Sequence, residues 1–287
     1  MMTDTQKHRV VFVSGLSGAG KSVVLHALED LDFYCIDNFP ISLLDKLSEQ
    51  IDQYPRSIAI GINVRYQEHR VQELPHTINR LKLKRIDAEL IYLEADDEVL
   101  TKRFSETRRK HPFSTTLQSL ADAIENEKEL LRPLAIIAGL KIDSSHTSVH
   151  DLRKIINERV VGRGATSLSI QLMSFGFKHG TPRDADFMFD VRCLPNPYWI
   201  KDLRAFSGKD EPVRKYLQRQ PLVMKMSEQL NQFVSEWIPS FEAENRSYLT
   251  IAIGCTGGRH RSVFLINQMA EKIQAEGRQA LVRHRDM

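Results

Sequence analysis

The stretch GCTGGRHRS, residues 254–262, carries residue types and a spacing that phosphate chemistry uses. Cys255 and Arg261 follow the order C-x5-R-S, in which a thiolate attacks a phosphate that the arginine holds. The stretch lies between an apolar run, 248–253, and a helical pattern, 262–275. A loop in that position points backbone N–H groups at an anion whatever its side chains do. Anion binding without turnover, phosphatase catalysis and a purely structural turn therefore all stay open.

The side chains of this loop would suit an anion. A cysteine near a helix N-terminus and flanked by basic residues is expected to have a lowered pKa, and Arg261 can offer a phosphate two parallel N–H donors. A phosphatase would also need a general acid, and the sequence does not rank Asp184, Asp186 and Asp190 for that role. We therefore carry forward anion binding by Arg261 and by the backbone of Gly257 and Gly258.

Another phosphate motif, GLSGAGKS at 15–22, matches G-x4-G-K-[ST] in full and lies between an apolar run and a helical pattern. In chain order, 15–22 is named the first loop and 254–262 the second loop. Such a loop surrounds a β-phosphate with backbone N–H groups, while its lysine reaches the β- and γ-phosphates and its serine binds Mg²⁺. We expect Lys21 and Ser22 to act in catalysis and Ser22 to be the metal ligand. The predicted nucleotide site comprises Gly15, Leu16, Ser17, Gly18, Ala19, Gly20, Lys21 and Ser22.

Two further groups could serve this loop. A carboxylate that helps to hold Mg²⁺ has several candidates, each of which is also a common cap or turn residue. The segment 93–112 resembles the lid approach of small-molecule kinases, and the alternative is a solvated basic helix face. The carboxylates are Asp37, Glu94, Asp96 and Asp143, and the lid arginines are Arg103, Arg108 and Arg109.

Each loop must lie between the end of a strand and the start of a helix. Apolar runs alternate with helical patterns up to about residue 160, which predicts an α/β fold with a P-loop NTPase-type parallel sheet and helices on both faces. The linker VGRGAT follows, and the second half reads as another α/β unit with its own anion-binding loop. We expect a P-loop domain over 1–160 and a phosphate- or RNA-binding domain over 165–287. The expected strands are 10–13, 58–64, 90–93, 140–142, 168–175, 187–191 and 248–253, and the expected helices include 42–53, 71–83, 121–131 and 230–241.

Composition is that of an ordinary globular protein. The 287 residues are 41% hydrophobic and 27% charged, and the net charge of +3 is only a weak pointer to nucleic acid. No apolar run approaches the ~18 residues of a spanning helix, and no signal segment opens the chain. Three widely spaced cysteines predict reduced thiols and no cysteine-built zinc site. We expect a cytoplasmic homo-oligomer that does not act at membranes.

Five blocks of sequence, in order, resemble the RapZ/YvcJ family of bacterial P-loop nucleotide-binding proteins, and the resemblance spans essentially the whole chain. It implies an N-terminal domain that binds and slowly hydrolyses ATP or GTP. In the enterobacterial member, the C-terminal domain is an adapter that presents a small regulatory RNA to an endoribonuclease and senses an amino-sugar phosphate. The blocks are SGLSGAGKSVVLHALED (14–30), FYCIDNFP (33–40), SETRRKHP (105–112), FGFKHGTPRDADFMFDVRCLPNPYW (175–199) and NRSYLTIAIGCTGGRHRSV (245–263).

Two segments depart from the family pattern. The family's proposed guanine-nucleotide segment, Asp-Val-Arg-Asn, corresponds here to Asn63, Val64, Arg65 and Tyr66. The carboxylate that would accept from guanine is absent, so ATP is the first expectation and GTP the second. The enterobacterial adapter ends in a Lys/Arg-rich tail, whereas this chain ends in VRHRDM, which offers fewer contacts to RNA phosphates.

At the second loop the resemblance implies a pocket for an anion or phosphosugar. We expect a nucleotide-binding regulator or adapter with slow ATPase activity. Its rivals are a small-molecule kinase that uses Lys21, Ser22 and the arginines at 103–109, an RNA-binding module, and a cysteine phosphatase. The expected contributors to the second pocket are His179, Asp190, Arg192, Cys255, Thr256, Gly257, Gly258, His260 and Arg261.

Overall fold

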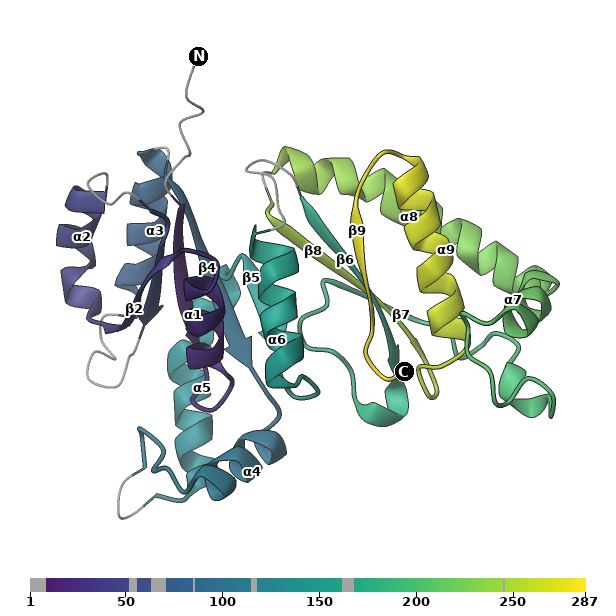
Figure 1. Cartoon of the computed structure of the whole chain (residues 1–287), viewed down its shortest axis with the longest axis horizontal. Helices are drawn as coiled ribbons and strands as arrows, with labels where there is room; N and C mark the ends of the chain where they lie inside the picture. Colours follow the sequence, from purple (N-terminus) through teal and green to yellow (C-terminus); the bar gives the residue numbers. More distant parts are fainter. Residues whose placement is uncertain are drawn as a thin grey trace. The chain divides into compact units, whose positions relative to one another are not determined.

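The computed structural model describes seven stretches of the chain and divides it into two compact units, Met1–Gly162 and Arg163–Met287, each of which is considered by itself (Figure 1). No helix among the described residues is both long and apolar enough to cross a bilayer. The described residues are 9–51, 56–62, 71–84, 86–114, 118–161, 168–244 and 246–287.

The first unit is built on a five-stranded, all-parallel sheet with the strand order β2-β3-β1-β4-β5. The central strands β1 and β4 are almost continuously buried, which is the pattern of strands covered on both faces. The strands are β1 (Arg9–Gly15), β2 (Tyr34–Phe39), β3 (Ile58–Ile62), β4 (Asp87–Glu94) and β5 (Leu140–Asp143).

Helices cover both faces of this sheet (Figure 1). Helix α1 packs against α6, and α3 packs against α5, so two helix pairs bury the apolar strands. The helices are α1 (Lys21–Glu29), α2 (Leu44–Gln50), α3 (Glu73–Leu83), α4 (Asp97–Thr107), α5 (Leu120–Ile137) and α6 (Val149–Ile156), with the 3-10 turn η1 (Ile41–Leu43) and the π-turn η4 (Asn157–Val161).

The second unit contains a four-stranded, all-parallel sheet with the order β7-β8-β6-β9. Strand β8 is buried at every position and lies against the long helix α8 and against α9 in one apolar core. The elements are β6 (Ser169–Gly176), η5 (Phe177–His179), β7 (Phe187–Asp190), η6 (Pro197–Trp199), α7 (Glu211–Gln218), α8 (Pro221–Ala243), β8 (Tyr248–Cys255), α9 (Arg261–Ala275) and β9 (Ala280–His284).

The predicted α/β class, with a parallel sheet in the first unit and a second α/β unit after it, is confirmed, and the sheet of the second unit is parallel as well. Some boundaries and elements differ from expectation. The predicted helix at 230–241 belongs to a longer helix that begins at Pro221. Leu230, Val234 and Ile238 face the apolar core of the second unit, while Trp237 is 47% exposed. Strand β9 and helix α6 were not predicted from the sequence. Both elements mix apolar and charged residues and lack the long apolar runs that identified the central strands.

Candidate functional site

The first loop, between β1 and α1, depends on glycine. Gly15 has φ +135°, and a Cβ there would lie 2.1 Å from the carbonyl oxygen of Leu93 on the adjacent strand. Gly20, immediately before α1, has φ +109°, and a Cβ there would lie 2.8 Å from a methyl carbon of Leu152. Only glycine adopts these conformations at so little cost. The loop therefore opens at the carboxyl edge of the sheet, with the N-terminus of α1 behind it.

Lys21 is folded back onto this loop. Its Nζ donates to the carbonyl oxygens of Gly15, at 2.6 Å, and Leu16, at 3.1 Å. Burial lowers the pKa of Lys21, while the charges of two nearby carboxylates, Glu127 and Asp37, oppose that shift. An ammonium group has three donors, so one remains for an incoming phosphate.

A buried carboxylate that the sequence analysis missed holds the same loop from α5. Glu127 accepts the backbone N–H of Ser17 at 2.8 Å and its hydroxyl at 2.7 Å. His111 Nε2 lies 3.3 Å from Glu127. The Nδ1 atom of His111 accepts the N–H of Phe113, and the other ring nitrogen faces the carboxylate of Glu127.

Two opposing effects set the charge of Glu127. Burial raises its pKa, but the hydrogen bond from His111, the charge of Lys21 and the donors of the phosphate loop outweigh burial, and the pKa lies below its usual value. Glu127 is therefore a carboxylate at neutral pH. A detectable signal was present in the sequence, because Glu127 occupies a core-facing position of α5 among Ala123, Ile124 and Leu131.

Of the three lid arginines, Arg103 contacts the phosphate loop. Its guanidinium donates to the carbonyl oxygen of Gly18 at 3.0 Å, and to the hydroxyl and carbonyl of Ser144 at 3.0 and 2.7 Å. Burial lowers its pKa, against the opposing charge of Asp143. Arg108 and Arg109 are exposed at the end of α4. The structure thus brings together the first loop and one of these arginines.

The carboxylate candidates for a metal separate in the same way. Asp37 lies within β2 with its Oδ1 2.6 Å from where a Cβ of Gly61 would be, and its charge acts on Lys21. Asp143 accepts the N–H and hydroxyl of Ser145 in a turn after β5. Asp96 is the N-cap residue of α4. Of these candidates, Asp37 is the one whose negative charge acts on Lys21.

These residues fit Mg²⁺ as a companion of bound phosphates. Ser22 is exposed in the first turn of α1. No group of three or more His, Cys, Asp or Glu side chains gathers to hold a metal ion anywhere in the described part of the chain. Mg²⁺ commonly takes one or two protein ligands together with phosphate oxygens and water, which Ser22 and Asp37 can supply. The predicted guanine segment, Asn63, Val64, Arg65 and Tyr66, lies outside the described residues.

The second loop lies at the carboxyl edge of the other sheet. Strand register pairs Gly176 of β6 with Cys255 of β8, and Asp190 of β7 with Gly254 of β8. The segments after these strands therefore meet at one edge, where open parallel sheets bind ligands. Lys178, which the sequence analysis missed, donates its N–H to the carbonyl of Thr256 at 3.2 Å.

Arg261 is built into this edge and is only 4% exposed. Its Nη1 donates to the carbonyl oxygens of Arg192 and Leu194, at 2.8 and 2.9 Å, and its Nη2 donates to the Thr256 hydroxyl at 3.2 Å. Its buried Nε makes no hydrogen bond with any described residue. Nε and the remaining Nη2 proton form one edge of the guanidinium, which is the fork that binds a phosphate oxygen pair.

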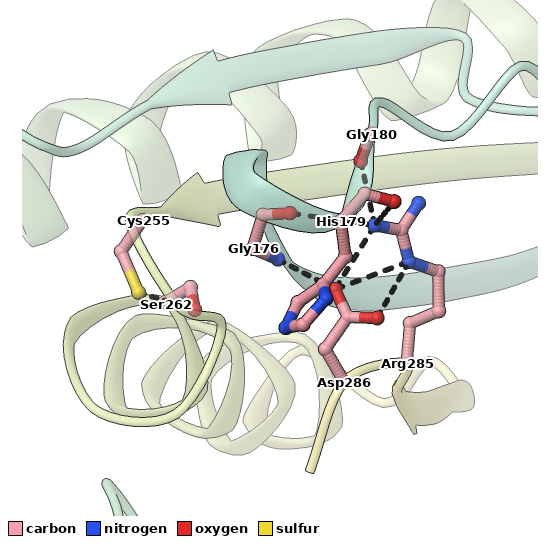
Figure 2. Close-up of polar contacts among 7 residues, drawn as sticks. All are labelled: Gly176, His179, Gly180, Cys255, Ser262, Arg285 and Asp286. Carbon is pink, nitrogen blue, oxygen red and sulfur yellow. Dashed lines mark hydrogen bonds and ion pairs between the residues drawn. The ribbon is translucent and has the colours of Figure 1, made fainter.

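Cys255 is buried, and its Sγ lies 3.2 Å from the hydroxyl of Ser262 (Figure 2). Burial raises its pKa, but the hydrogen bonds of Ser262 and the charge of Arg261 outweigh burial, and the pKa lies below its usual value. His260 is also buried, and burial together with the charges of Arg259 and Arg261 lowers its pKa, so its ring is neutral.

Three of the remaining predicted contributors, Asp190, Arg192 and His179, are exposed at the rim, whereas Gly258 is buried. Asp190 and Arg192 form an ion pair of 2.7 Å, and the guanidinium of Arg192 lies 4.0 Å above the ring of Phe177. His179, in η5, is exposed. Gly258 has φ +70°, a conformation that favours glycine. The edge thus combines backbone donors, a buried fork and exposed cations.

The acid that a phosphatase needs is poorly supplied. Asp186 precedes β7, at the opposite end of the strand, and accepts the N–H of Thr250 at 2.8 Å. Asp190 is at the correct edge, but hydrogen bonds from Arg192 hold its pKa below the usual value, so it is not protonated at neutral pH. This geometry supports binding at the second loop more than it supports a cysteine nucleophile.

Comparisons with known proteins cover both units. The family description "RapZ-like N-terminal domain" matches residues 8–164, and "RapZ C-terminal domain" matches residues 168–287. A nucleotide-binding protein of Halorhodospira halophila is 46% identical over 97% of this chain and 98% of its own. One of Alcanivorax borkumensis is 47% identical over 97% of this chain and 100% of its own. A solved shikimate kinase of Bacteroides thetaiotaomicron matches 52% of this chain and 97% of its own, with 15% identity and a TM-score of 0.37.

Proposed function

The chain belongs to the RapZ family, as its sequence blocks predicted, and from this premise we propose that the first loop binds ATP with Mg²⁺ and hydrolyses it slowly, with GTP as a second nucleotide. Its relatives in Halorhodospira halophila and Alcanivorax borkumensis are nucleotide-binding proteins, which supports the binding step. The observation that carries the proposal is Lys21, a desolvated ammonium held by Gly15 and Leu16 at the mouth of a glycine loop.

In this proposal the loop stabilises charge more than it performs covalent chemistry. Backbone N–H groups and the α1 terminus bind the β-phosphate, and Lys21 leaves its two carbonyl partners for phosphate oxygens. Mg²⁺, held by Ser22 and Asp37, would neutralise charge between the phosphates. Slow turnover is expected because Glu127, the best-buried carboxylate at the loop, is already committed to Ser17 and His111.

Equilibrium titration with fluorescent ATP and GTP analogues, with and without Mg²⁺, tests the proposal. We expect ATP to bind more tightly than GTP, and Mg²⁺ to strengthen binding in the wild-type chain more than in Ser22→Ala. Equal affinity of wild type and Lys21→Ala for ATP would exclude the first loop as the nucleotide site.

We also propose that the second loop binds a phosphorylated small molecule, so that the protein is a regulator or adapter in the cytosol. The unpartnered, buried Nε of Arg261 supports this binding role, because a buried donor without an acceptor is costly and a phosphate oxygen would satisfy it. Family resemblance gives the adapter role, in which unit 2 presents a small regulatory RNA to an endoribonuclease.

An exposed aromatic segment supports the RNA part of the proposal. Trp199 is 75% exposed and lies edge-on to Tyr198, at 5.6 Å between ring centroids. The guanidinium of Arg204 lies 4.8 Å above the Tyr198 ring. Aromatic rings interleaved with cations stack on unpaired bases. RNA binding that falls steeply with salt and weakens in Trp199→Ala, but not in the α8 variant Trp237→Ala, would support it, and no RNA binding at low salt would exclude it.

A small-molecule kinase is the second candidate, because Arg103 touches both Gly18 and Ser144 beside the loop. Arginines in this position neutralise the transferring phosphoryl group. Transfer of labelled phosphate from ATP to a metabolite, lost in Lys21→Ala, would favour the kinase. Release of inorganic phosphate alone would favour the nucleotide-hydrolysing regulator.

A further inference from the structure

The last residues of the chain close over the loop that follows β6 (Figure 2). The side chains of Arg285 and Asp286 are only 4% and 7% exposed and form an ion pair of 2.9 Å. Asp286 Oδ2 accepts the backbone N–H of Gly176 at 2.7 Å. Arg285 Nη2 donates to the carbonyl oxygens of Gly180, at 2.6 Å, and His179, at 3.3 Å. The pair therefore holds both ends of the loop 176–180.

The same pair lies against the second phosphate loop. A Cβ on Gly258 would lie 2.7 Å from the nitrogen of Gly176 and 3.1 Å from the Cβ of Asp286. A Cβ on Gly176 would lie 2.6 Å from the carbonyl carbon of Gly257. Backbones approach so closely that only glycine fits. The 176–180 loop, the second phosphate loop and Asp286 thus pack as one body.

Lys178 is carried by the loop that the pair holds. Its Nζ lies 3.8 Å from where a Cβ of Gly257 would be, and its N–H donates to the carbonyl of Thr256 at 3.2 Å. The ammonium group therefore lies beside the glycines of the phosphate loop. Its position depends on a five-residue segment, 176–180, whose two ends are bonded to Arg285 and Asp286.

We propose that Arg285 and Asp286 are positioning residues of the second loop: they hold Lys178 beside Gly257 and so raise the affinity of this site for a phosphate group. The inference rests on the proposed phosphate-binding role of the second loop. A buried ion pair is costly unless hydrogen bonds satisfy it. Here those bonds go to the 176–180 loop, so order at the chain's end and order in the loop are coupled.

The test measures binding of inorganic phosphate by the full chain, by calorimetry or amide chemical shifts, with the first loop saturated by a non-hydrolysable ATP analogue and Mg²⁺. The variants are Asp286→Ala, Lys178→Ala and the double variant. Met287→Ala is the matched control, because Met287 is the exposed neighbour of Asp286. Hydrogen exchange of the Gly176 amide reports whether the loop itself has been released.

We expect phosphate to bind Asp286→Ala roughly five- to tenfold more weakly than wild type, the scale of one charge-assisted hydrogen bond. The Asp286→Ala change should have no further effect once Lys178 is alanine, because the pair acts through that side chain. Faster exchange at Gly176 should accompany the loss, and Met287→Ala should match wild type.

Wild-type affinity in Asp286→Ala would overturn the inference, as would equal losses from Asp286→Ala with and without Lys178. Failure of the wild-type chain to bind phosphate at the second loop is a different result. It would overturn the proposed function of that loop, and with it any role of Arg285 and Asp286 in affinity, whatever the exchange at Gly176 shows.

Discussion

The two phosphate loops share a strand–loop–helix order, but they hold their basic residue in different ways. Among the described residues, Lys21 bonds to the carbonyls of Gly15 and Leu16 in its own loop, six and five residues away. Arg261 bonds to the carbonyls of Arg192 and Leu194, on a distant segment. Each cation therefore holds two carbonyl oxygens, but those held by Lys21 lie in its own loop, whereas those held by Arg261 tie the second loop to the segment 192–194. In the proposed functions, Lys21 turns from its own loop to the phosphates of a nucleotide, whereas Arg261 stays bound to the segment 192–194 and holds its ligand without turnover.

The carboxylates near the loops differ in the same sense. Glu127 bonds directly to Ser17 of the first loop, so this loop contacts a negative charge before any ligand binds. At the second loop, Asp190 is paired with Arg192 at the rim and Asp286 is paired with Arg285. Of the acids described at this edge, Asp190 and Asp286 are each paired with a cation, which leaves the positive Arg261 and Lys178 for the proposed anion.

The largest expected effect is the fall in nucleotide turnover in Lys21→Ala. Removing one phosphate-stabilising donor should lower nucleotide turnover by about 100-fold or more. Stability should change little, because a desolvated cation is removed and its partner carbonyls belong to the same loop. Steady-state phosphate release and thermal unfolding measure both effects. The control is Lys46→Ala, an exposed lysine of α2.

Arg261→Ala should show the opposite balance. We expect the free energy of unfolding of unit 2 to fall by about 2–4 kcal/mol, because buried carbonyls lose a charged donor. Both tryptophans, Trp199 and Trp237, belong to unit 2, so their fluorescence follows its denaturation. The exposed Arg259→Ala is the control. If Lys21→Ala destabilises its unit as strongly as Arg261→Ala does, the contrast between the loops is wrong.

The sequence predicted what is local and missed what is distant. Both loops were found because strand, glycines and helix are contiguous, and the central strands because their apolar runs are continuous. Glu127 was missed because it lies 110 residues from Ser17 and only the fold brings the two together. The partners of Arg261 were invisible for a further reason, since the direction of a backbone carbonyl is not written in side-chain types.

A smaller effect is expected for Glu127→Gln, which keeps the shape but loses one acceptor for Ser17. ATP affinity should fall roughly fivefold to tenfold, the scale of one charge-assisted hydrogen bond. The control is Glu129→Gln, an exposed position two residues along α5. Unchanged affinity would remove Glu127 from the description of the loop.

The same variant has a pH signature. The folded pKa of Glu127 lies below its usual value, so its stabilisation is fully present above the unfolded pKa of about 4.3 and is lost as the pH falls through the folded value. The stability gap between wild type and Glu127→Gln should therefore narrow in acid. A gap that widens in acid would contradict the assignment.

The smallest expected effect concerns His284, which adjoins the Arg285–Asp286 pair. Burial lowers its pKa to about 4, and its Nδ1 lies 2.8 Å from the hydroxyl of Ser174. Between about 6.5 and about 4 the unfolded chain binds a proton at this position that the folded chain does not. Unit 2 should therefore lose stability as the pH falls through that window.

His284→Gln should flatten this slope, whereas His150→Gln, at an exposed position of α6, should leave it unchanged. Tryptophan-detected denaturation across the window measures it. A lowered pH should also reduce the protection of the Gly176 amide, measured as its exchange rate relative to the intrinsic rate at each pH, because His284 and the pair that holds Gly176 lie on consecutive residues. If the stability of unit 2 changes with pH and the protection of Gly176 does not, protonation of His284 affects β9 alone. The structure of the second loop would then not change with pH, as expected if Arg261 stays bonded to the carbonyls of Arg192 and Leu194.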